Sequence, residues 1–267
     1  MLDIRRNSHR ILFIMRIDKT QLTAADRKLT DRVRRKFREG IRTYHLIAPG
    51  DHVLVGLSGG KDSMALLQLL GEYRRHAAQP FGLSALHVRM QGIDYRTDAR
   101  YLEDFAHEQG ADFYLQSCEM PTDRNARRTP CFLCSWTRRK ALFTLAQQLR
   151  CQRIALGHHR DDILTTALMN LTYNGSFSTM PVRQAFRKMP LEIIRPLCRV
   201  GEDDLRTWAE IYQYEPLLKV CPHDREGQRQ EMRGLLETMQ NMNAEAKSSL
   251  WHALQKANKL VELEDAL

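Results

Sequence analysis

The chain has 267 residues, and its hydrophobic fraction of 43% and charged fraction of 27% are close to the averages for soluble globular proteins. The longest apolar run near the start, residues 11–15, is interrupted by Arg16 and is too short for a membrane span or a signal-peptide core. We therefore expect a cytoplasmic protein without a membrane partner. Its six cysteines should stay reduced and serve as metal ligands, catalytic groups or core residues.

The net charge of +9 is concentrated in two segments. Residues 16–42 contain ten Lys or Arg against four Asp or Glu, and residues 124–160 contain nine Lys or Arg and no acidic residue. Such clusters favour a polyanion as partner, with nucleic acid first. A solvated basic face on a soluble protein would have the same composition, so charge alone leaves both interpretations open.

An N-terminal extension, residues 1–17, shows no periodicity and precedes a basic helix within residues 18–48. Thr23 and Asp26 form a capping-box pattern at the start of this helix. Its apolar positions recur at helical spacing and are Leu29, Val33, Phe37 and Ile41. The opposite face is basic and contains Arg32, Arg34, Arg35, Lys36 and Arg38. We expect the apolar face to pack on the protein and the basic face to meet solvent or a polyanion.

Strands and helices alternate along residues 49–200. The predicted strands are 52–57, 82–88, 113–116 and 152–156, and the predicted helices are 62–73, 97–109, 135–149 and 162–173. This alternation predicts an α/β fold, a parallel sheet with helices on both faces. After Pro196 the pattern is helical, at residues 202–214, 226–242 and 246–262. We expect this C-terminal helical segment, residues 201–267, to pack on the same domain.

The strongest motif is a glycine loop, SGGKDS, between the first predicted strand and the following helix. Unpaired amides at a helix N-terminus bind phosphate, and the helix dipole favours negative charge there. The two glycines permit close approach of a ligand, the two serines offer hydroxyls, and the lysine can neutralise charge. The spacing differs from G-x-x-x-x-G-K-[ST], so this is not a P-loop of that type. The candidate phosphate-binding residues are Ser58, Gly59, Gly60, Lys61, Asp62 and Ser63.

A second motif, GHHRDD, begins at Gly157 and follows another predicted strand. Ligand groups gather at the carboxyl ends of parallel strands, so this motif can share an edge with the glycine loop. Gly157 and His158 are candidate contacts to the nucleotide. Asp161 and Asp162, with Asp62, are candidates for holding Mg²⁺ or for acid–base catalysis. In the competing interpretation, the two consecutive aspartates only favour the start of a helix through its dipole.

Cys131 and Cys134 form a C-x-x-C pair in the basic segment. Two thiolates at this spacing can bind one metal or cluster, or cycle as a redox pair. Cys221 can supply a third ligand. The remaining cysteines lie in or beside apolar stretches and are expected to be core residues; they are Cys118, Cys151 and Cys198.

Together these motifs resemble those of the PP-loop ATPases, or N-type ATP pyrophosphatases, and within them those of the tRNA 2-thiocytidine synthetase (TtcA) family. The resemblance extends from about residue 28 to about residue 258. It includes the glycine loop, the C-x-x-C pair with the arginines after it, GHHRDD, IRPL at 194–197, Cys221 and GQRQ at 227–230. The implied fold is adenine nucleotide alpha hydrolase-like, and the glycine loop would hold the pyrophosphate leaving group of ATP.

The resemblance implies a tRNA-cytidine 2-sulfurtransferase. In that family, ATP adenylates a cytidine carbonyl at position 32 of the tRNA anticodon loop, and sulfur then replaces the oxygen. It also implies a [4Fe-4S] cluster on Cys131, Cys134 and Cys221, with one iron left open for sulfur. The expected cofactors are thus ATP, Mg²⁺ and this cluster. The expected partners are tRNA and a sulfur donor such as a cysteine desulfurase, and a homodimer is a possible assembly.

Departures from the family pattern leave alternatives open. The family usually has a second C-x-x-C where this chain has CPHD, so His223 offers a nitrogen beside Cys221 that could complete a zinc site. Thr165 stands where the family often has Glu. A tRNA lysidine synthetase, or another PP-loop tRNA-modifying enzyme, would share the glycine loop but leave the cysteines without a role. The alternative from another class is a non-catalytic nucleic-acid-binding Fe–S or zinc protein.

Overall fold

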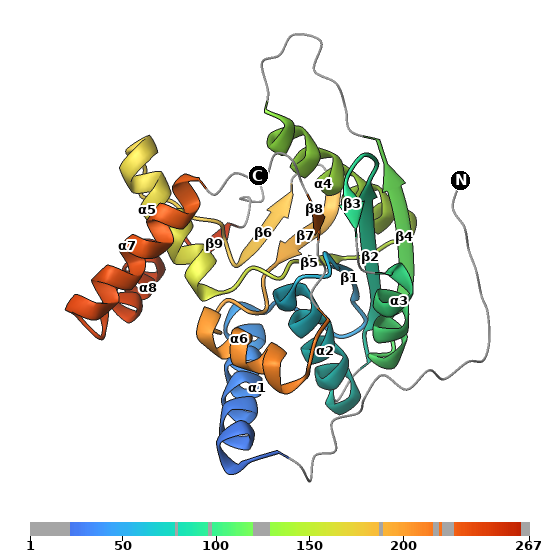
Figure 1. The fold of residues 1–267 in the computed structure, drawn as a ribbon, viewed down its shortest axis with the longest axis horizontal. Coiled ribbons are helices and arrows are strands. Elements are labelled where there is room, and N and C mark those ends of the chain that lie inside the picture. The colour runs from blue at the N-terminus through green and yellow to red at the C-terminus, as the bar shows by residue number, and fades with distance from the viewer. Residues whose placement is uncertain are drawn as a thin grey trace.

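The structure, a computed structural model, describes residues 22–77, 80–95, 98–119, 129–186, 189–215, 219–220 and 227–262. Within these ranges the central element is a seven-stranded sheet in the order β4-β2-β1-β5-β7-β6-β9 (Figure 1). Its strands are β1 (His52–Gly56), β2 (Gly82–Met90), β4 (Asp112–Cys118), β5 (Arg153–Ala155), β6 (Arg183–Phe186), β7 (Met189–Ile194) and β9 (Val261–Glu262). The extension of residues 1–17 lies outside the described residues.

The first five strands of the sheet are mutually parallel; they are β4, β2, β1, β5 and β7. Strand β6 runs antiparallel to β7. The helices are α1 (Ala24–Tyr44), α2 (Lys61–His76), α3 (Ala99–Glu108), α4 (Pro130–Gln148), α5 (Arg160–Asn174), α6 (Glu202–Ile211), α7 (Gln228–Met242) and α8 (Ala246–Lys256). The α/β fold with a largely parallel sheet is therefore confirmed. Among the described helices, none is long and apolar enough to cross a membrane.

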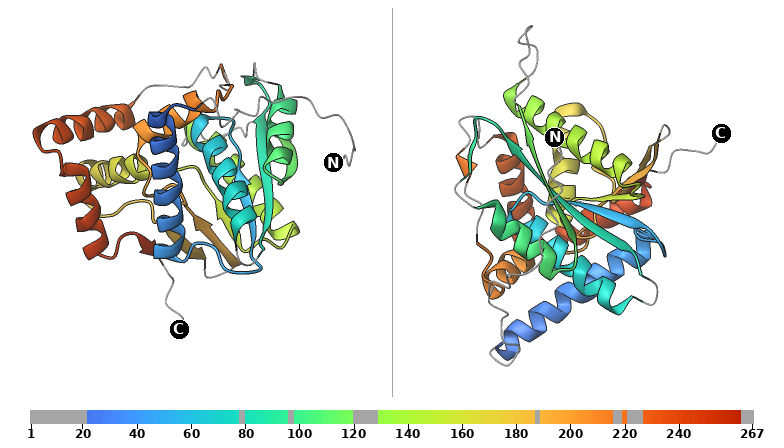
Figure 2. Two further views of the ribbon diagram at one scale, coloured as in Figure 1. Left: turned by 90° about the horizontal axis from the view of Figure 1, so that it is seen from below. Right: turned by 90° about the vertical axis from the view of Figure 1, so that its right-hand side faces the viewer.

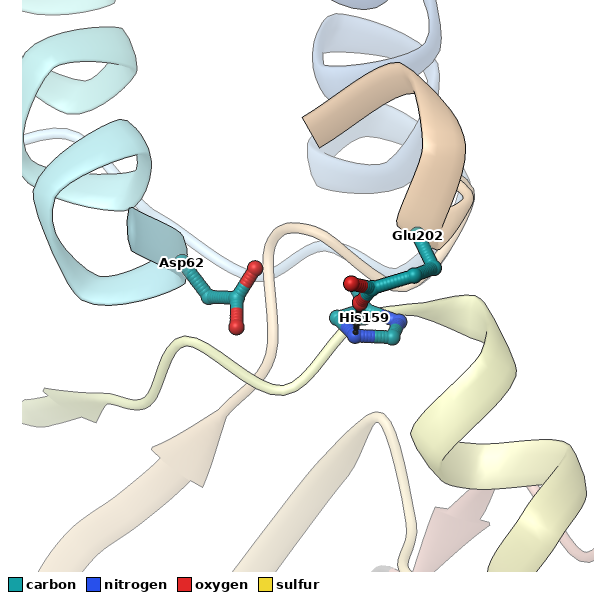
Figure 3. Close-up of side chains that lie close together, drawn as sticks. All are labelled: Asp62, His159 and Glu202. Carbon is teal, nitrogen blue, oxygen red and sulfur yellow. Dashed lines mark ion pairs between the residues drawn. The ribbon is translucent and has the colours of Figure 1, made fainter. Parts of the chain in front are cut away.

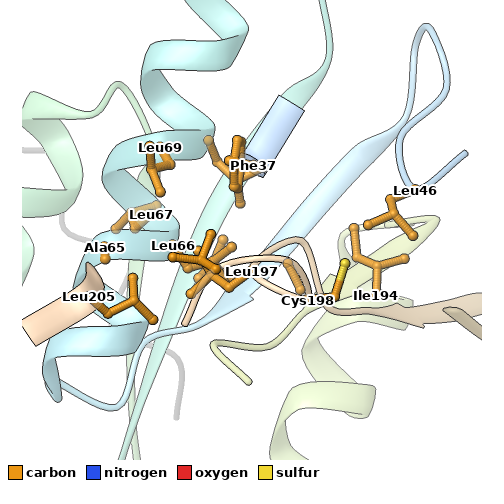
Figure 4. Close-up of a cluster of buried hydrophobic side chains, with 14 of the residues drawn as sticks. Phe37, Leu46, Ala65, Leu66, Leu67, Leu69, Ile194, Leu197, Cys198 and Leu205 are labelled. Carbon is orange, nitrogen blue, oxygen red and sulfur yellow. The ribbon is translucent and has the colours of Figure 1, made fainter. Parts of the chain in front are cut away.

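Alternate residues of the central strand β1 pack in two separate hydrophobic cores. Val53 and Val55 belong to the larger core. Figure 4 shows other members of this core, among them Phe37 of α1, Leu66 of α2 and Leu205 of α6. Leu54 points to the other face, where Leu145 of α4 and Ile154 of β5 belong to the second core. This alternation follows from the two-residue period of a strand. The sheet is thus covered on both faces, with α4 on one side and α1 and α2 on the other (Figure 2).

Helix α1 shows where an expectation from the sequence is wrong. The capping box is present, with the Thr23 side chain accepting from the Asp26 amide. Part of the basic face, however, is turned into the protein. Arg32 and Lys36 both pair with one carboxylate of α6, Asp204, at 2.7 and 2.8 Å. Arg34 pairs with Glu72 of α2 at 2.7 Å, and its guanidinium lies 5.2 Å from the centre of the Trp208 ring of α6. Ion pairs therefore hold α1 against α2 and α6.

The C-terminal elements pack on the sheet domain, α6 against α1 and α2, and α7 and α8 against α5. The predicted helix 246–262 is too long, because α8 ends at Lys256. Asn258 has a positive φ of 53°, the left-handed conformation that ends a helix. The chain then turns back to the sheet, where β9 pairs with β6. The hairpin of β6 and β7 and the short ribbon of β3 (Asp94–Tyr95) and β8 (Lys219–Val220) were not predicted.

Candidate active site

Helix N-termini converge at the carboxyl edge of the sheet. In a parallel sheet each strand ends where the following helix begins, and α2, α5 and α6 follow β1, β5 and β7 in this way. Their first residues are Lys61, Arg160 and Glu202. Each helix start presents unpaired backbone N–H groups and the positive end of a dipole. The edge is therefore suited to a phosphate-rich ligand.

The glycine loop lies at this edge and is shaped by its own hydroxyls. Gly59 has φ of 85°, a conformation that disfavours any residue with a side chain. The buried Ser63 hydroxyl accepts the Ser58 amide at 3.1 Å and contacts the Ser58 hydroxyl at 3.0 Å. It also donates to the Gly60 carbonyl at 2.9 Å. The buried Ser63 thus stabilises the loop from the protein side, while Ser58 is exposed and accessible to a ligand.

The GHHRDD motif packs directly on the glycine loop, as expected from their places at neighbouring strand ends. A Cβ added to Gly157 would lie 3.0 Å from backbone atoms of Asp62 and Ser63. Contacts this short are tighter than nearly all real Cβ contacts, so a side chain at this position would push the two loops apart. His158 therefore stands next to the glycine loop.

Three side chains from three helix starts meet beside the loop (Figure 3). The ligand atoms of Asp62, His159 and Glu202 lie within 4.8 Å of one another. His159 Nε2 is 2.8 Å from a Glu202 carboxylate oxygen. Lys61 Nζ bridges the two carboxylates, at 2.8 Å from Asp62 and 3.0 Å from Glu202. Two partly exposed carboxylates with a buried imidazole are a donor set that fits a divalent cation.

Charges in this cluster stabilise one another. The close contact with His159 outweighs the opposing effect of burial and, with Lys61, lowers the pKa of Glu202 to about 2. Burial alone would lower the pKa of His159, but Glu202, Asp162 and Asp62 raise it above its ordinary value. Burial would likewise lower the pKa of Lys61, whereas Asp62 and Glu202 raise it. The cluster therefore contains an ionised Glu202 beside a histidine that favours its protonated form.

Asp161 and Asp162 are both buried and have partners within the protein. Asp161 accepts the Glu202 amide at 3.0 Å and pairs with Lys247 at 3.3 Å. Asp162 accepts the His159 amide at 3.2 Å and pairs with Arg233 at 2.7 Å. Both carboxylates thus fix the backbone of residues in the cluster. Their suggested roles in Mg²⁺ binding or acid–base catalysis stay predictions.

Glu202 was missed by the sequence analysis. It is the first residue of α6, just after Gly201 and a few residues after the IRPL segment. An acidic residue at a helix start is common because of the dipole, so the residue type alone was not a signal. Its place beside Asp62 depends on α6 starting next to α2, which the sequence does not specify.

The C-x-x-C pair lies on the first turn of α4. The helix begins at Pro130, earlier than predicted, because Thr129 caps it by accepting the Phe132 amide at 3.3 Å. Cys131 is exposed and Cys134 is half-buried. Spacing of three residues places both thiols on one side of a helix N-terminus, where the dipole favours thiolates.

Cys221 lies outside the described residues. It directly follows β8, which pairs with β3, and β3 follows β2 beyond its carboxyl end. The chain just before Cys221 is therefore held at the same edge as the start of α4, since α4 follows β4 in the same parallel sheet.

The other cysteines occupy core positions. Cys151 and Cys198 are buried, and burial raises the pKa of these thiols to about 11 and about 12. Cys118 is half-buried, and burial raises the pKa of its thiol as well. A protonated, inaccessible thiol is a poor metal ligand and nucleophile. The expectation that these cysteines are core residues agrees with this burial.

Comparisons with known proteins agree with this geometry. A model of the PP-loop domain matches residues 29–216. A tRNA-cytidine(32) 2-sulfurtransferase from Citrifermentans bemidjiense is 31% identical over 85% of this chain and 91% of that protein. The protein of the same name from Neisseria meningitidis serogroup C is 34% identical over 89% of this chain and 75% of its own length.

The solved structure of the U34-tRNA thiolase NcsA from Methanococcus maripaludis with its [4Fe-4S] cluster has a similar fold. The TM-score is 0.70 at 24% sequence identity, over 90% of this chain and 82% of that one. Because the identity is low, this likeness extends to the fold. The domain match and the curated relatives extend further: this chain belongs to the PP-loop family and, within it, to the tRNA-cytidine(32) 2-sulfurtransferases.

Proposed function

We propose that this chain thiolates a cytidine of the tRNA anticodon loop at the expense of ATP. The observation that carries the proposal is the convergence of the glycine loop and the C-x-x-C helix start at one edge of the sheet. An enzyme that adenylates an oxygen and then replaces it with sulfur needs a nucleotide site and a sulfur site near one substrate atom. Its curated relatives are named for that reaction at cytidine 32.

The chemistry follows from the poor leaving ability of a carbonyl oxygen. The cytidine oxygen attacks the α-phosphorus of ATP, the bond from that phosphorus to the β-phosphate bridge breaks, and pyrophosphate leaves. Hydrosulfide then attacks the activated carbon, the carbon–oxygen bond breaks, and AMP leaves with its oxygen while a proton is released. Donors at the three helix starts stabilise the negative charge that develops on the phosphates.

Asp62 and Glu202 are the side chains that we propose as Mg²⁺ ligands. Their side chains are 31% and 28% exposed, and both form an ion pair with Lys61. Carboxylate oxygens from two elements, with phosphate oxygens completing the shell, suit this cation. Asp161 and Asp162 would then act through Glu202 and His159, whose amides they accept.

Cys131, Cys134 and Cys221 are the residues that we propose to hold a [4Fe-4S] cluster, the kind of cluster that the thiolase with the similar fold contains. Four cysteines usually hold such a cluster, so three would leave one iron able to carry sulfur. A cysteine desulfurase in the cytoplasm is a chemically suitable source of that sulfur.

Helix α4 offers a surface for RNA beside the cysteines. Trp136 is 47% exposed, Phe132 is 50% exposed, and the ammonium group of Lys140 lies 5.5 Å from the centre of the Trp136 ring. Exposed aromatic rings among basic residues stack on unpaired bases, which is how proteins commonly bind RNA loops. A tRNA lysidine synthetase would not need the C-x-x-C pair, and the named relatives do not favour it.

The proposal is tested with protein purified without oxygen. We expect iron and acid-labile sulfide, pyrophosphate release that depends on tRNA, and 2-thiocytidine in the tRNA after addition of ATP and sulfide. Ser58→Ala should lower pyrophosphate release but keep the iron, whereas Cys131→Ala should lose iron and thiolation. Cys151→Ser is the matched control and should keep both. One zinc per chain, unaffected by reconstitution with iron and sulfide, would contradict the cluster.

A further inference from the structure

Arg195, in the IRPL segment just after β7, is a buried cation without a carboxylate partner in the part of the chain that the structure describes. Only 6% of the residue is exposed. Among the described residues, no carboxylate lies within ion-pair distance of its guanidinium. One Nη donates to the Pro181 carbonyl, while the buried Nε has no hydrogen-bond partner there. Buried charges are normally paired, so an unpaired one at a site edge indicates a missing anion.

The groups that act on Arg195 do not neutralise it, since Arg139 adds positive charge and His158 is a neutral imidazole at neutral pH. His158, at the end of the adjacent strand β5, also has a buried nitrogen, Nδ1, without a partner among the described residues. Burial and the charge of Arg195 lower the pKa of His158 to about 4. Burial and Arg139 of α4 lower the pKa of Arg195 to about 10. Asp162 is the acidic group that acts on His158, but its oxygens already accept from Arg233 and the His159 amide.

His158 lies beside the glycine loop, and Arg195 lies close enough to His158 to act on its charge. Strands β5 and β7 are paired in register, with Ala155 opposite Ile194, so the segments after them leave the sheet together. His158 follows Gly157, which packs on the backbone of Asp62 and Ser63. A ligand whose terminal phosphates occupy the glycine loop would therefore present its next phosphate toward His158 and Arg195.

We propose that Arg195 and His158 bind the α-phosphoryl group, both in ATP and in the adenylate, while the glycine loop binds the pyrophosphate part. The inference rests on the proposed function and divides its nucleotide site into two halves. Arg195 keeps the same contact when the bond between the α-phosphorus and the pyrophosphate oxygen breaks and the bond to the cytidine oxygen forms. A backbone phosphate of tRNA is a poorer fit, because a polyanion bound at the surface meets exposed cations first.

The test measures binding of AMP and of inorganic pyrophosphate separately, each with Mg²⁺, by calorimetry on the full chain. Arg195→Met should weaken AMP binding at least about tenfold, since a charge-assisted hydrogen bond is lost, and leave pyrophosphate binding unchanged. Ser58→Ala should weaken pyrophosphate binding and leave AMP binding unchanged. Arg199→Met is the matched control, because Arg199 lies four residues along and faces Glu39 at 3.6 Å. It should change neither affinity.

Thermal unfolding without ligand separates a binding role from a structural one. Replacing an unpaired buried cation with an apolar chain should leave the melting temperature of Arg195→Met unchanged or raised. Arg195→Lys, which keeps the charge but loses donors, should fold and bind AMP with intermediate affinity. Unchanged AMP binding in both variants would overturn the inference alone. The inference would also be overturned if Arg195→Met lost stability and bound both AMP and pyrophosphate more weakly. A wild-type chain that binds neither ligand would overturn the proposed function as well.

Discussion

At the scale of single residues, His159 links the nucleotide site to the stability of the fold. It is 1% exposed and lies between Glu202 and Asp162, at 2.8 and 3.3 Å. In the neutral ring, Nδ1 accepts the Asp161 amide at 3.2 Å and caps α5, a contact that protonation of this nitrogen would remove. Protonation at one nitrogen therefore affects both a helix start and a proposed Mg²⁺ ligand.

The pH dependence of stability should report this contact. Because Glu202 raises the pKa of His159 above its ordinary value of 6.5, the folded state binds a proton more tightly than the unfolded state. The stabilisation is complete below about pH 6.5 and is lost as the pH rises through the raised pKa. We expect the free energy of unfolding, measured with urea, to fall over that range.

His159→Gln and Glu202→Gln should each flatten this part of the profile. Measuring the difference between wild type and variant removes the contribution of other histidines, such as His158, whose lowered pKa acts in the acid range. A wild-type slope that persists in both variants would show that His159 does not gain a proton through Glu202.

Sequence predicted the local parts of the site and missed the distant ones. The glycine loop is predictable because its conformation depends on six consecutive residues, with Gly59 at φ of 85°. Glu202 and Arg195 are not predictable in this way, because their roles depend on which strand ends and helix starts become neighbours. Asp161 and Asp162 illustrate the converse, since two adjacent carboxylates suggested a metal while the fold gives each a cationic partner.

At the scale of elements, the basic residues of α1 and α4 lie in different surroundings. In α1, Arg32, Arg34 and Lys36 have carboxylate partners on α2 and α6. In α4, the run from Arg138 to Lys140 lies on the helix that carries the cysteines and the exposed aromatics. The α4 run is therefore the better candidate for tRNA.

Salt dependence of tRNA binding should distinguish the helices. Replacing Arg138, Arg139 and Lys140 with Gln should reduce the slope of log affinity against log salt by roughly 2, as expected for three lost phosphate contacts. Replacing the exposed Arg35 and Arg38 of α1 is the control and should have a smaller effect. An unchanged slope in the α4 variant would mean that this helix does not face the RNA.

Predicted elements were most accurate where one local signal determined them. The capping box at Thr23 fixed the start of α1, and strand–loop–helix alternation gave the parallel sheet. The predicted start of α4 at residue 135 is too late, because Thr129 as the N-cap and Pro130 in the first turn begin the helix at Pro130. β9 was placed in a helix because Leu260 and Val261 continue the apolar spacing, although left-handed Asn258 ends α8 before them.

At the scale of the whole molecule, topology brings four separate segments to one edge. The glycine loop, GHHRDD, the start of α6 and the start of α4 each follow a different strand of the parallel sheet. None of the four would form a site alone. Their convergence places the candidate nucleotide-binding groups, two candidate Mg²⁺ ligands and the thiols of α4 at one edge of the sheet, as the proposed two-stage reaction requires.

The most direct test of the central claim is nucleoside analysis of tRNA from a strain that lacks this chain. We expect 2-thiocytidine to disappear from digested tRNA, as measured by mass spectrometry, and to return when the wild-type chain is supplied. Ser58→Ala, which alters the glycine loop, and Cys131→Ala, which alters the proposed cluster site, should both fail to restore it. A normal amount of 2-thiocytidine in the deletion strain would contradict the account.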